Sequence, residues 1–169
     1  INADDYYGKT TFREMHDFMM QTDSDLGLAA FLVGNTLSEN GGVSRAVVQV
    51  SGDEVTKLVE TKGLERVGYE ARAGDKAYPL DTFVSMNMFA LTPAFLKMLK
   101  EGFSGFLANM EDEQKDEYLL PGVIDQCIAD GTAVLKTVPT HEKWLGVTFS
   151  DDLPAVQEAF RKLHENGVY

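Results

Sequence analysis

The chain of 169 residues is poor in cysteine, and it has no apolar run that approaches the length of a membrane span. Its single cysteine, Cys127, excludes an internal disulfide and favours a reducing compartment, so we predict a cytoplasmic protein with no membrane partner. The apolar pattern around Cys127 predicts that its thiol is buried in the core. Neither a Cys/His cluster with metal-ligand spacing nor an internal repeat occurs, which argues against zinc-binding and repeat architectures.

Basic residues are also few. The chain has 15 Lys and Arg against 27 Asp and Glu, which gives a net charge of −12. Such a surface repels nucleic acid and anionic lipid, so we expect neither as a partner. It also opposes the binding of free nucleotides unless lysine, arginine or a metal ion compensates locally. The glycine-bearing loop at 34–42 is not a phosphate-binding loop of a familiar kind, because no Lys-Ser/Thr pair follows it and no G-x-G-x-x-G is present.

Helix and strand signals alternate along the chain. The 44% hydrophobic content excludes disorder, and the length suits one α/β domain that covers residues 1–169. Their order predicts a mixed sheet with antiparallel hairpins, flanked by helices. We expect strands at 26–33, 43–50, 55–60, 64–72, 76–80, 83–91 and 132–138, and helices at 10–21, 92–109, 121–131 and 150–167.

The first residues place two acids next to a strand signal. Ile1-Asn2-Ala3 is typical of the end of a buried strand, and Asp4 and Asp5 follow at once. Because the chain begins without Met inside a strand signal, we predict that it is a piece of a longer protein. Ligands bind open α/β sheets at the carboxyl ends of their strands, and Mg²⁺ is held there by one or two carboxylates with substrate phosphates. The alternative is that Asp4 or Asp5 only caps the following helix.

Two further polar residues stand at unusual positions. Arg45 lies at the entrance of the first hairpin, where its cation meets a phosphate, is solvated or forms an ion pair. Asn87 interrupts an apolar strand, so its amide either ties down neighbouring backbone or faces a ligand.

Several stretches resemble the sugar-1-phosphate nucleotidyltransferase superfamily, and more closely a bacterial subgroup of it. They are Ile1-Asn2-Ala3-Asp4-Asp5, Gly34-Asn35-Thr36-Leu37-Ser38, Val43-Ser44-Arg45, Leu58-Val59-Glu60-Thr61-Lys62, Val84-Ser85-Met86-Asn87-Met88-Phe89 and Trp144-Leu145-Gly146-Val147-Thr148-Phe149. The resemblance implies the C-terminal portion of a Rossmann-like, GT-A-like nucleotidyltransferase fold. The implied reaction transfers a nucleoside monophosphate from an NTP to a sugar 1-phosphate and releases pyrophosphate, with Mg²⁺ as cofactor.

The resemblance also implies roles for individual residues. Asp4 is the expected principal Mg²⁺ ligand, with Asp5 beside it, and Glu60 and Asn87 are expected to contact the sugar. Lys62 stands one residue after the place of the family's phosphate-binding lysine and is a candidate for that contact. Independently of the resemblance, Arg45 and Lys143 are candidates for contacts with phosphate, and Lys143 is the candidate catalytic cation. We therefore expect Glu60, Asn87 and Lys143 to line one pocket.

Two departures from the family pattern leave other readings open. Thr61 stands where the family has the lysine that contacts the sugar phosphate, and Gly146 replaces its second metal-binding aspartate. The glycine-rich loop that holds the triphosphate in the family would precede Ile1. A non-catalytic ligand-binding or regulatory module and a glycosyltransferase-like domain are the alternatives, and a homo-oligomer is possible.

Overall fold

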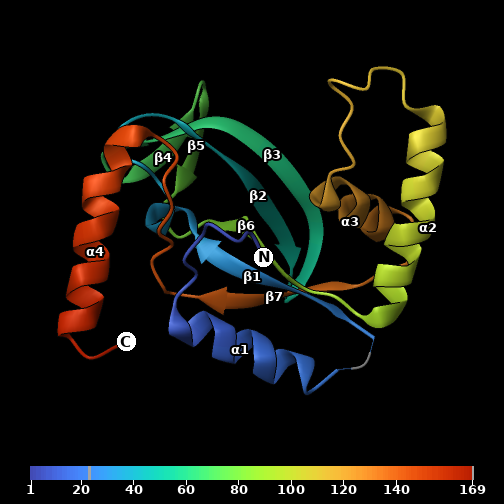
Figure 1. Cartoon of the computed structure of the whole chain (residues 1–169), viewed down its shortest axis with the longest axis horizontal. Coiled ribbons are helices and arrows are strands. Elements are labelled where there is room, and N and C mark those ends of the chain that lie inside the picture. The colour runs from blue at the N-terminus through green and yellow to red at the C-terminus, as the bar shows by residue number, and fades with distance from the viewer. Residues whose placement is uncertain (23, 169) are drawn as a thin grey trace.

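The computed structural model describes residues 1–22 and 24–168, which form a mixed α/β fold (Figure 1). The helices are α1 (Lys9–Met19), α2 (Pro93–Asn109), α3 (Leu120–Ala129) and α4 (Leu153–Glu165), with short 3-10 turns η1 (Val33–Asn35) and η2 (Ser150–Asp152). The strands are β1 (Leu26–Leu32), β2 (Val43–Ser51), β3 (Glu54–Val67), β4 (Glu70–Ala73), β5 (Lys76–Pro79), β6 (Phe83–Ala90) and β7 (Leu135–Thr140).

The sheet has the order β2-β6-β1-β7-β3-β4-β5, and β2 also pairs with β3. The strands β2, β6, β1, β7 and β3 therefore close into a five-strand ring, from which β4 and β5 extend. Only β1 and β7 pair in parallel among the pairs that the structure describes. The predicted mixed sheet with antiparallel hairpins and flanking helices is confirmed. The ring corrects the prediction of an open Rossmann-like sheet, because Glu54 at the start of β3 pairs with Ser51 of β2 and with Lys136 of β7.

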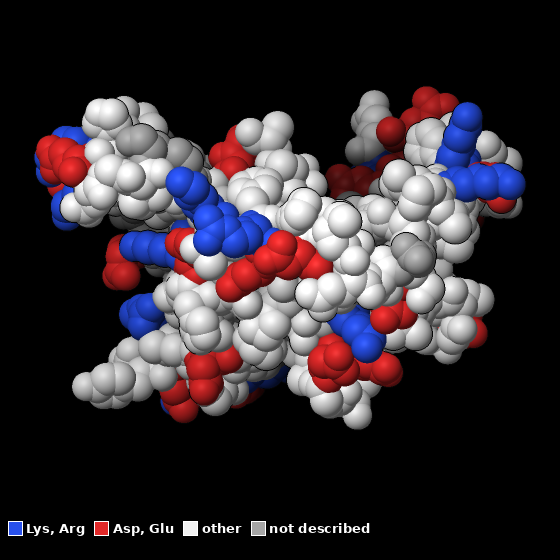
Figure 2. Space-filling view, turned by 90° about the horizontal axis from the view of Figure 1, so that it is seen from below, with Lys and Arg blue, Asp and Glu red and all other residues white. Residues whose placement is uncertain are grey.

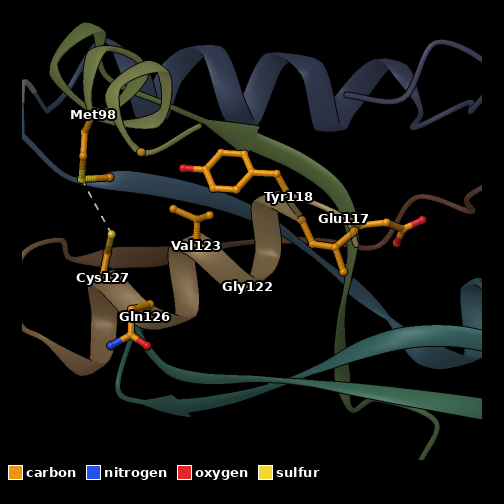
Figure 3. Close-up of a pocket in the computed structure, with 9 residues that line it drawn as sticks. Met98, Glu117, Tyr118, Gly122, Val123, Gln126 and Cys127 are labelled. Carbon is orange, nitrogen blue, oxygen red and sulfur yellow. Dashed lines mark hydrogen bonds between the residues drawn. The ribbon is translucent and has the colours of Figure 1, made fainter. Parts of the chain in front are cut away.

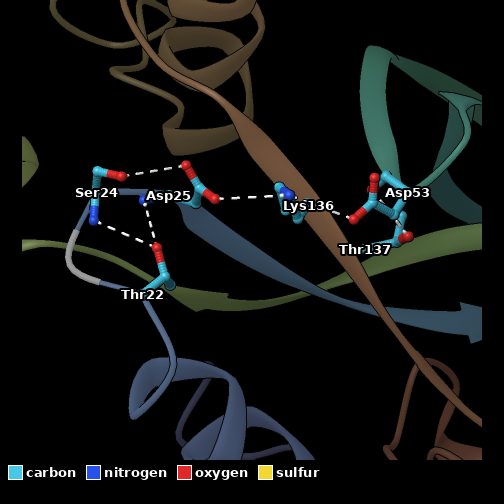
Figure 4. Close-up of polar contacts among 6 residues, drawn as sticks. All are labelled: Thr22, Ser24, Asp25, Asp53, Lys136 and Thr137. Carbon is cyan, nitrogen blue, oxygen red and sulfur yellow. Dashed lines mark hydrogen bonds and ion pairs between the residues drawn. The ribbon is translucent and has the colours of Figure 1, made fainter.

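The ring closes at the β2–β3 turn, which is fastened to β7 (Figure 4). The Thr137 N–H donates to the Asp53 carbonyl oxygen at 2.8 Å, and the Thr137 hydroxyl donates to the same oxygen at 3.1 Å. Lys136 Nζ lies 3.4 Å from an Asp53 carboxylate oxygen and 3.7 Å from one of Asp25, so one cation joins β7, the turn and the start of β1. The hydrogen bond to Asp53 and its charge raise the pKa of Lys136 above its ordinary value.

Two apolar clusters lie on opposite faces of β1, since successive side chains of a strand point to opposite sides. Leu26 and Leu28 belong to a cluster with residues of α2 and α3, and Cys127 is part of it. Ala29 and Phe31 belong to a second cluster with residues of α1 and the segment before it. Figure 1 shows α1 beneath β1 and β7, whereas α2 and α3 lie together at the right of the view. The predicted burial of Cys127 is confirmed, with 7% of the residue exposed.

Two local predictions are wrong. Ile1, Asn2 and Ala3 are exposed and form no strand; the first sheet-like contact is a single bridge between Tyr6 and Leu145. A short apolar segment cannot become a buried strand unless a neighbouring strand pairs with it. The stretches 55–60 and 64–72 were expected as separate strands, but β3 runs from Glu54 to Val67 through Gly63, whose φ of 71° suits glycine.

None of the helices in residues 1–22 and 24–168 is both long and apolar enough to cross a membrane. On the face seen in Figure 2, acidic and basic side chains are interspersed in small clusters with uncharged areas between them. The excess of acidic residues is therefore not gathered into one continuous patch on that face.

Candidate functional site

A cavity of about 600 Å³ opens between β2, β3, β6 and the segment that leads into α3. Five residues singled out from the sequence line it: Asp5, Arg45, Glu60, Lys62 and Asn87. The remaining lining residues are Asn2, Ser44, Ala46, Leu58, Ser85, Met86, Glu117, Leu119, Pro121, Gly122 and Asp125. We call this space the strand cavity.

The register of the sheet brings these side chains together. Ala46 of β2 lies opposite Glu60 of β3 on one side and opposite Ser85 of β6 on the other. On β3, alternation points Leu58, Glu60 and Lys62 to the same face. Leu58 is buried, whereas Glu60 and Lys62 are exposed, so this wall is apolar toward the protein and charged toward solvent.

The start of α3 closes one side of the strand cavity. Asp125 accepts a hydrogen bond from the Leu58 N–H at 2.9 Å through its Oδ1. This bond fastens α3 to β3 and uses one oxygen of the carboxylate. Asp125 therefore has a structural role in positioning this wall.

Asn87 lies on a bulge in β6. Between Leu28 and Ala30 of β1 the pairing shifts so that β6 carries two extra residues between Ser85 and Phe89. Asn87 has φ 60°, and asparagine tolerates this left-handed conformation better than most residues. Its backbone N–H donates to the Ser85 hydroxyl at 3.2 Å, while its side chain is exposed on the cavity wall. Within the described part of the chain the Asn87 side-chain amide makes no hydrogen bond, which agrees with the ligand-facing alternative.

Arg45 is a buried cation, with 8% of the residue exposed. Its Nη1 donates to the Ser44 carbonyl oxygen at 2.8 Å, and its Nη2 donates to that of Thr36 at 2.6 Å. Its Cζ lies 4.8 Å from the centre of the Trp144 ring, within the range of a cation–π contact. Its Nε is buried without a hydrogen-bond partner in the described chain. Arg45 thus connects β2 to the Thr36 backbone in the wall of the cavity, and its Nε–H donor stays without a partner among the described residues.

The charge of Arg45 has no direct counter-ion. No carboxylate of the described residues forms an ion pair with it, although Asp5, Glu60 and Asp152 are near enough to raise its pKa. Burial outweighs these three charges and lowers the pKa of Arg45 to about 10.

Asp5 also lines the strand cavity, next to a buried tyrosine. The hydroxyl of Tyr7 lies 2.9 Å from the Met86 carbonyl oxygen and 3.2 Å from Asp5 Oδ2, so it can donate to either. The Asn2 amide donates to Asp5 Oδ2 at 2.9 Å. Burial, more than the nearby carboxylates, raises the pKa of Tyr7 to about 12. Tyr7 and Asn2 therefore fix the orientation of Asp5 toward the cavity.

Asp4 does not line the strand cavity; it is exposed in a turn. A side chain at position 146 would begin 3.0 Å from Asp5 Oδ1, so Gly146 lies against Asp5 but supplies no second carboxylate. No group of three or more His, Cys, Asp or Glu side chains able to hold a metal ion occurs within residues 1–22 and 24–168. The Mg²⁺ site expected at Asp4 and Asp5 stays a prediction.

Lys143 lines a different and smaller cavity of about 130 Å³, with Trp144, Gly146 and Asp152 among its neighbours. Glu60 and Asn87 share the strand cavity, but Lys143 does not share it with them. This corrects the expectation of one pocket for all three residues. Lys143 lies in the loop after β7 and lines the smaller cavity together with residues of the 37–40 segment and α4.

Asp152 is a residue whose importance the sequence did not indicate. Its Oδ1 accepts from the Ser38 hydroxyl at 2.6 Å and from the Asn40 amide at 2.8 Å. Its Oδ2 accepts from the backbone N–H groups of Thr148 at 3.1 Å and Phe149 at 2.8 Å. Burial raises the pKa of Asp152, but these hydrogen bonds outweigh burial and hold the pKa below its ordinary value. In the sequence, Asp152 before Leu153-Pro154 indicated only the start of a helix. It did not indicate a contact with the 34–42 loop.

Fold and site together define a mixed α/β protein with a five-strand ring and an open polar cavity on one of its faces. No family model matches the chain. The chain is similar to a UPF0210 protein of Sulfurisphaera tokodaii, with 28% identity over 123 residues that cover 68% of this chain and 26% of that protein. The chain thus spans about a quarter of the length of this curated relative. The relative's name states no reaction, ligand or partner.

These comparisons correct the sequence-based assignment. The motifs resemble the sugar-1-phosphate nucleotidyltransferase superfamily, but no family model supports that membership and the relative found belongs to a differently named group. Short motifs such as Asp4-Asp5 or Asn87-Met88-Phe89 occur by chance in unrelated folds, so they do not establish a family. The superfamily assignment is wrong.

Proposed function

We propose that the strand cavity binds a small, hydroxyl-rich molecule that carries one phosphate, of the sugar monophosphate class. The observation that carries this proposal is the register at Ala46, which sets the carboxylate of Glu60, the amide of Asn87 and the cation of Lys62 on one open wall. In the described chain, none of these three side chains is engaged in an ion pair.

The chemistry of the wall suits such a ligand. A carboxylate accepts hydrogen bonds from neighbouring hydroxyl groups, and an amide both donates and accepts. The ammonium group of Lys62 is a mobile point charge at the mouth of the cavity, where a phosphate keeps part of its hydration. Ala46, Leu58 and Pro121 supply apolar surface for the C–H groups of a sugar ring.

The charge of the lining limits the ligand. Four acids, Asp5, Glu60, Glu117 and Asp125, outnumber the cations Arg45 and Lys62. This balance favours hydroxyl groups over a densely charged anion, so we expect a monophosphate to bind more tightly than a nucleoside triphosphate.

Binding without chemical turnover is the second candidate. It is favoured by Gly146, which leaves Asp5 without a partner carboxylate for a metal ion. Transfer of a nucleoside monophosphate, a requirement for Mg²⁺ and a cytoplasmic location stay predictions, and the binding proposal does not depend on them.

The test is calorimetric or NMR titration with glucose 1-phosphate, with glucose, inorganic phosphate and ATP as comparison ligands. We expect glucose 1-phosphate to bind more tightly than each of these. Glu60→Gln and Lys62→Met are each expected to weaken binding by about tenfold or more, since a hydrogen bond to a charged group is worth about 1.5–3 kcal/mol. Lys57→Met is the matched control, because Lys57 is exposed on the same strand and points to the other face.

Two results would overturn the proposal. One is the absence of binding at millimolar glucose 1-phosphate. The other is binding that Glu60→Gln and Lys62→Met leave at the affinity of the control variant.

A further inference from the structure

Two further cavities adjoin the strand cavity, and they differ in chemical character. The first adjoins it at the start of α3, where Glu117, Leu119 and Gly122 line both spaces. Figure 3 shows this apolar cavity of about 490 Å³, with the side chains of Met98 and Tyr118 beside α3. Among the described residues that line it, only Glu117 is charged, so this cavity offers no cation to a phosphate.

The second adjoining cavity is lined mainly by charged residues. It has a volume of about 340 Å³ and lies between β3 and the turn from β4 to β5. Its lining residues are Glu60, Thr61, Lys62, Ala73, Asp75 and Lys76. Glu60 and Lys62 line the strand cavity as well, so the two spaces meet at these side chains. We call the second space the hairpin cavity.

A bulge in β3 places Lys62 where the two cavities meet. Between Val43 and Arg45 of β2 the pairing shifts, so that Lys62 and Gly63 of β3 together lie opposite Ser44. Such a bulge bends the strand and redirects a side chain. Apart from its chain neighbours, no heavy atom lies within 4 Å of a Cβ built at Gly63, so the space beside the bulge is open.

The β4–β5 hairpin brings a second lysine to the same space. Glu65 of β3 pairs with Arg72 of β4, and this antiparallel register carries the end of β4 toward the bulge. Lys76 begins β5 and pairs with Ala73 at the turn. Lys62 and Lys76 are both exposed, and within the described part of the chain neither forms an ion pair.

The charges of the hairpin cavity favour an anion of low charge. Two ammonium groups that face one space repel each other, and an anion between them removes this repulsion. Asp75, the neighbour of Lys76 in the turn, and Glu60 oppose the two lysines. The balance of two cations and two acids suits a phosphate monoester better than a polyphosphate.

We infer that Lys76 is a second phosphate-binding residue of the site, and that the phosphate lies where the two cavities meet, between Lys62 and Lys76. This inference rests on the proposed binding of a sugar monophosphate, whose sugar keeps its contacts with Glu60 and Asn87. A lysine is a point charge on a flexible stem, so two lysines from different strands can approach one phosphate. Lys76 thereby selects phosphorylated over unphosphorylated sugars.

The test is NMR titration of the full chain with glucose 1-phosphate and with glucose, in the wild type and in Lys76→Met. Lys57→Met is the control, because it removes the same charge from an exposed position that lines neither cavity. Relative to this control, we expect Lys76→Met to weaken the binding of glucose 1-phosphate about two- to fivefold, the range of an exposed charge contact. The affinity for glucose should not change.

Two further variants separate a charge effect from a structural one. Lys76→Arg keeps the charge and should keep most of the affinity for glucose 1-phosphate. Asp75→Asn removes a negative charge from the same cavity and should strengthen this binding. The difference between the wild type and Lys76→Met should also shrink as salt is added, because salt screens exposed charges. Circular dichroism checks that each variant is folded, and Lys76→Gln replaces Lys76→Met if the latter does not fold.

The outcomes distinguish this inference from the proposed function. If Lys76→Met binds glucose 1-phosphate as the control does, while Glu60→Gln and Lys62→Met weaken binding, Lys76 does not contact the phosphate and the proposed function stands. A loss that affects glucose as strongly as glucose 1-phosphate would also overturn the inference. If the wild type binds no glucose 1-phosphate, the proposed function and this inference both fail.

Discussion

Asp152 joins two loops that lie far apart in the sequence, and its removal should destabilise the fold measurably. In Asp152→Ala the backbone N–H groups of Thr148 and Phe149 lose their acceptor. Each such loss costs about 1–1.5 kcal/mol in a partly buried position. The side-chain donors of Ser38 and Asn40 can turn toward water and contribute less. We expect a total of about 2–3 kcal/mol, which corresponds to a fall in Tm of roughly 5–10 °C for a chain of this size.

The measurement is urea unfolding and thermal unfolding at pH 7, followed by circular dichroism. Asp151→Ala is the control, since Asp151 is exposed and only accepts a long bond from the Ser150 hydroxyl at 3.4 Å. Asp152→Asn should fall between the two, because it keeps one acceptor oxygen. If Asp152→Ala unfolds at the same temperature as Asp151→Ala, the hydrogen bonds to Asp152 do not stabilise the fold as we argue.

The contribution of Asp152 also depends on pH in a defined direction. Its pKa in the folded protein lies below its ordinary value of 3.8. The stabilisation is therefore present above the pKa of the unfolded state and is lost as the pH falls through the folded pKa. The difference in stability between the wild type and Asp152→Asn should shrink as the pH is lowered from 5 toward 3.

Two other substitutions test the walls of the site. Gly146→Ala introduces a Cβ that would overlap the Trp144 ring and lie 3.0 Å from Asp5 Oδ1. We expect the free energy of unfolding to fall by about 1–3 kcal/mol and the near-UV circular dichroism spectrum to change. An unchanged Tm would contradict this packing. Tyr7→Phe removes the donor to the Met86 carbonyl oxygen and should cost about 1–2 kcal/mol near neutral pH. Since the pKa of Tyr7 is raised from 10.0 to about 12, its hydrogen bond stabilises the fold fully below pH 10 and is lost as the pH rises through 12. The gap in Tm between wild type and Tyr7→Phe should therefore narrow above pH 10, and a constant gap would contradict the shift.

Much of the secondary structure follows from local pattern. The continuous apolar run at 26–33 predicted β1, and Thr92-Pro93 predicted the start of α2 at Pro93. These predictions succeed because burial, capping and the fixed φ of proline act within a few residues.

The closure of the ring could not be read from the sequence. It depends on the pairing of Glu54 with Lys136, which are separated by about half of the chain and leave no periodic signal. The same limit applies to the site. Glu60 and Asn87 come together only because Ala46 pairs with a neighbour on each side, and the bulge at Asn87 depends on pairing with β1. Lys143 was grouped with them because its charge suits a phosphate, and the sequence holds no signal for a contact between these residues.

The contact between Arg45 and Trp144 has a practical consequence for the study of this molecule. Trp144 is the single tryptophan of the chain, and its ring lies against a guanidinium that forms part of the wall of the strand cavity. Indole emission responds to the charge and polarity of its immediate surroundings. The protein therefore contains its own optical reporter, placed one side chain away from the cavity, so occupancy of that space can be followed by intrinsic fluorescence without any label.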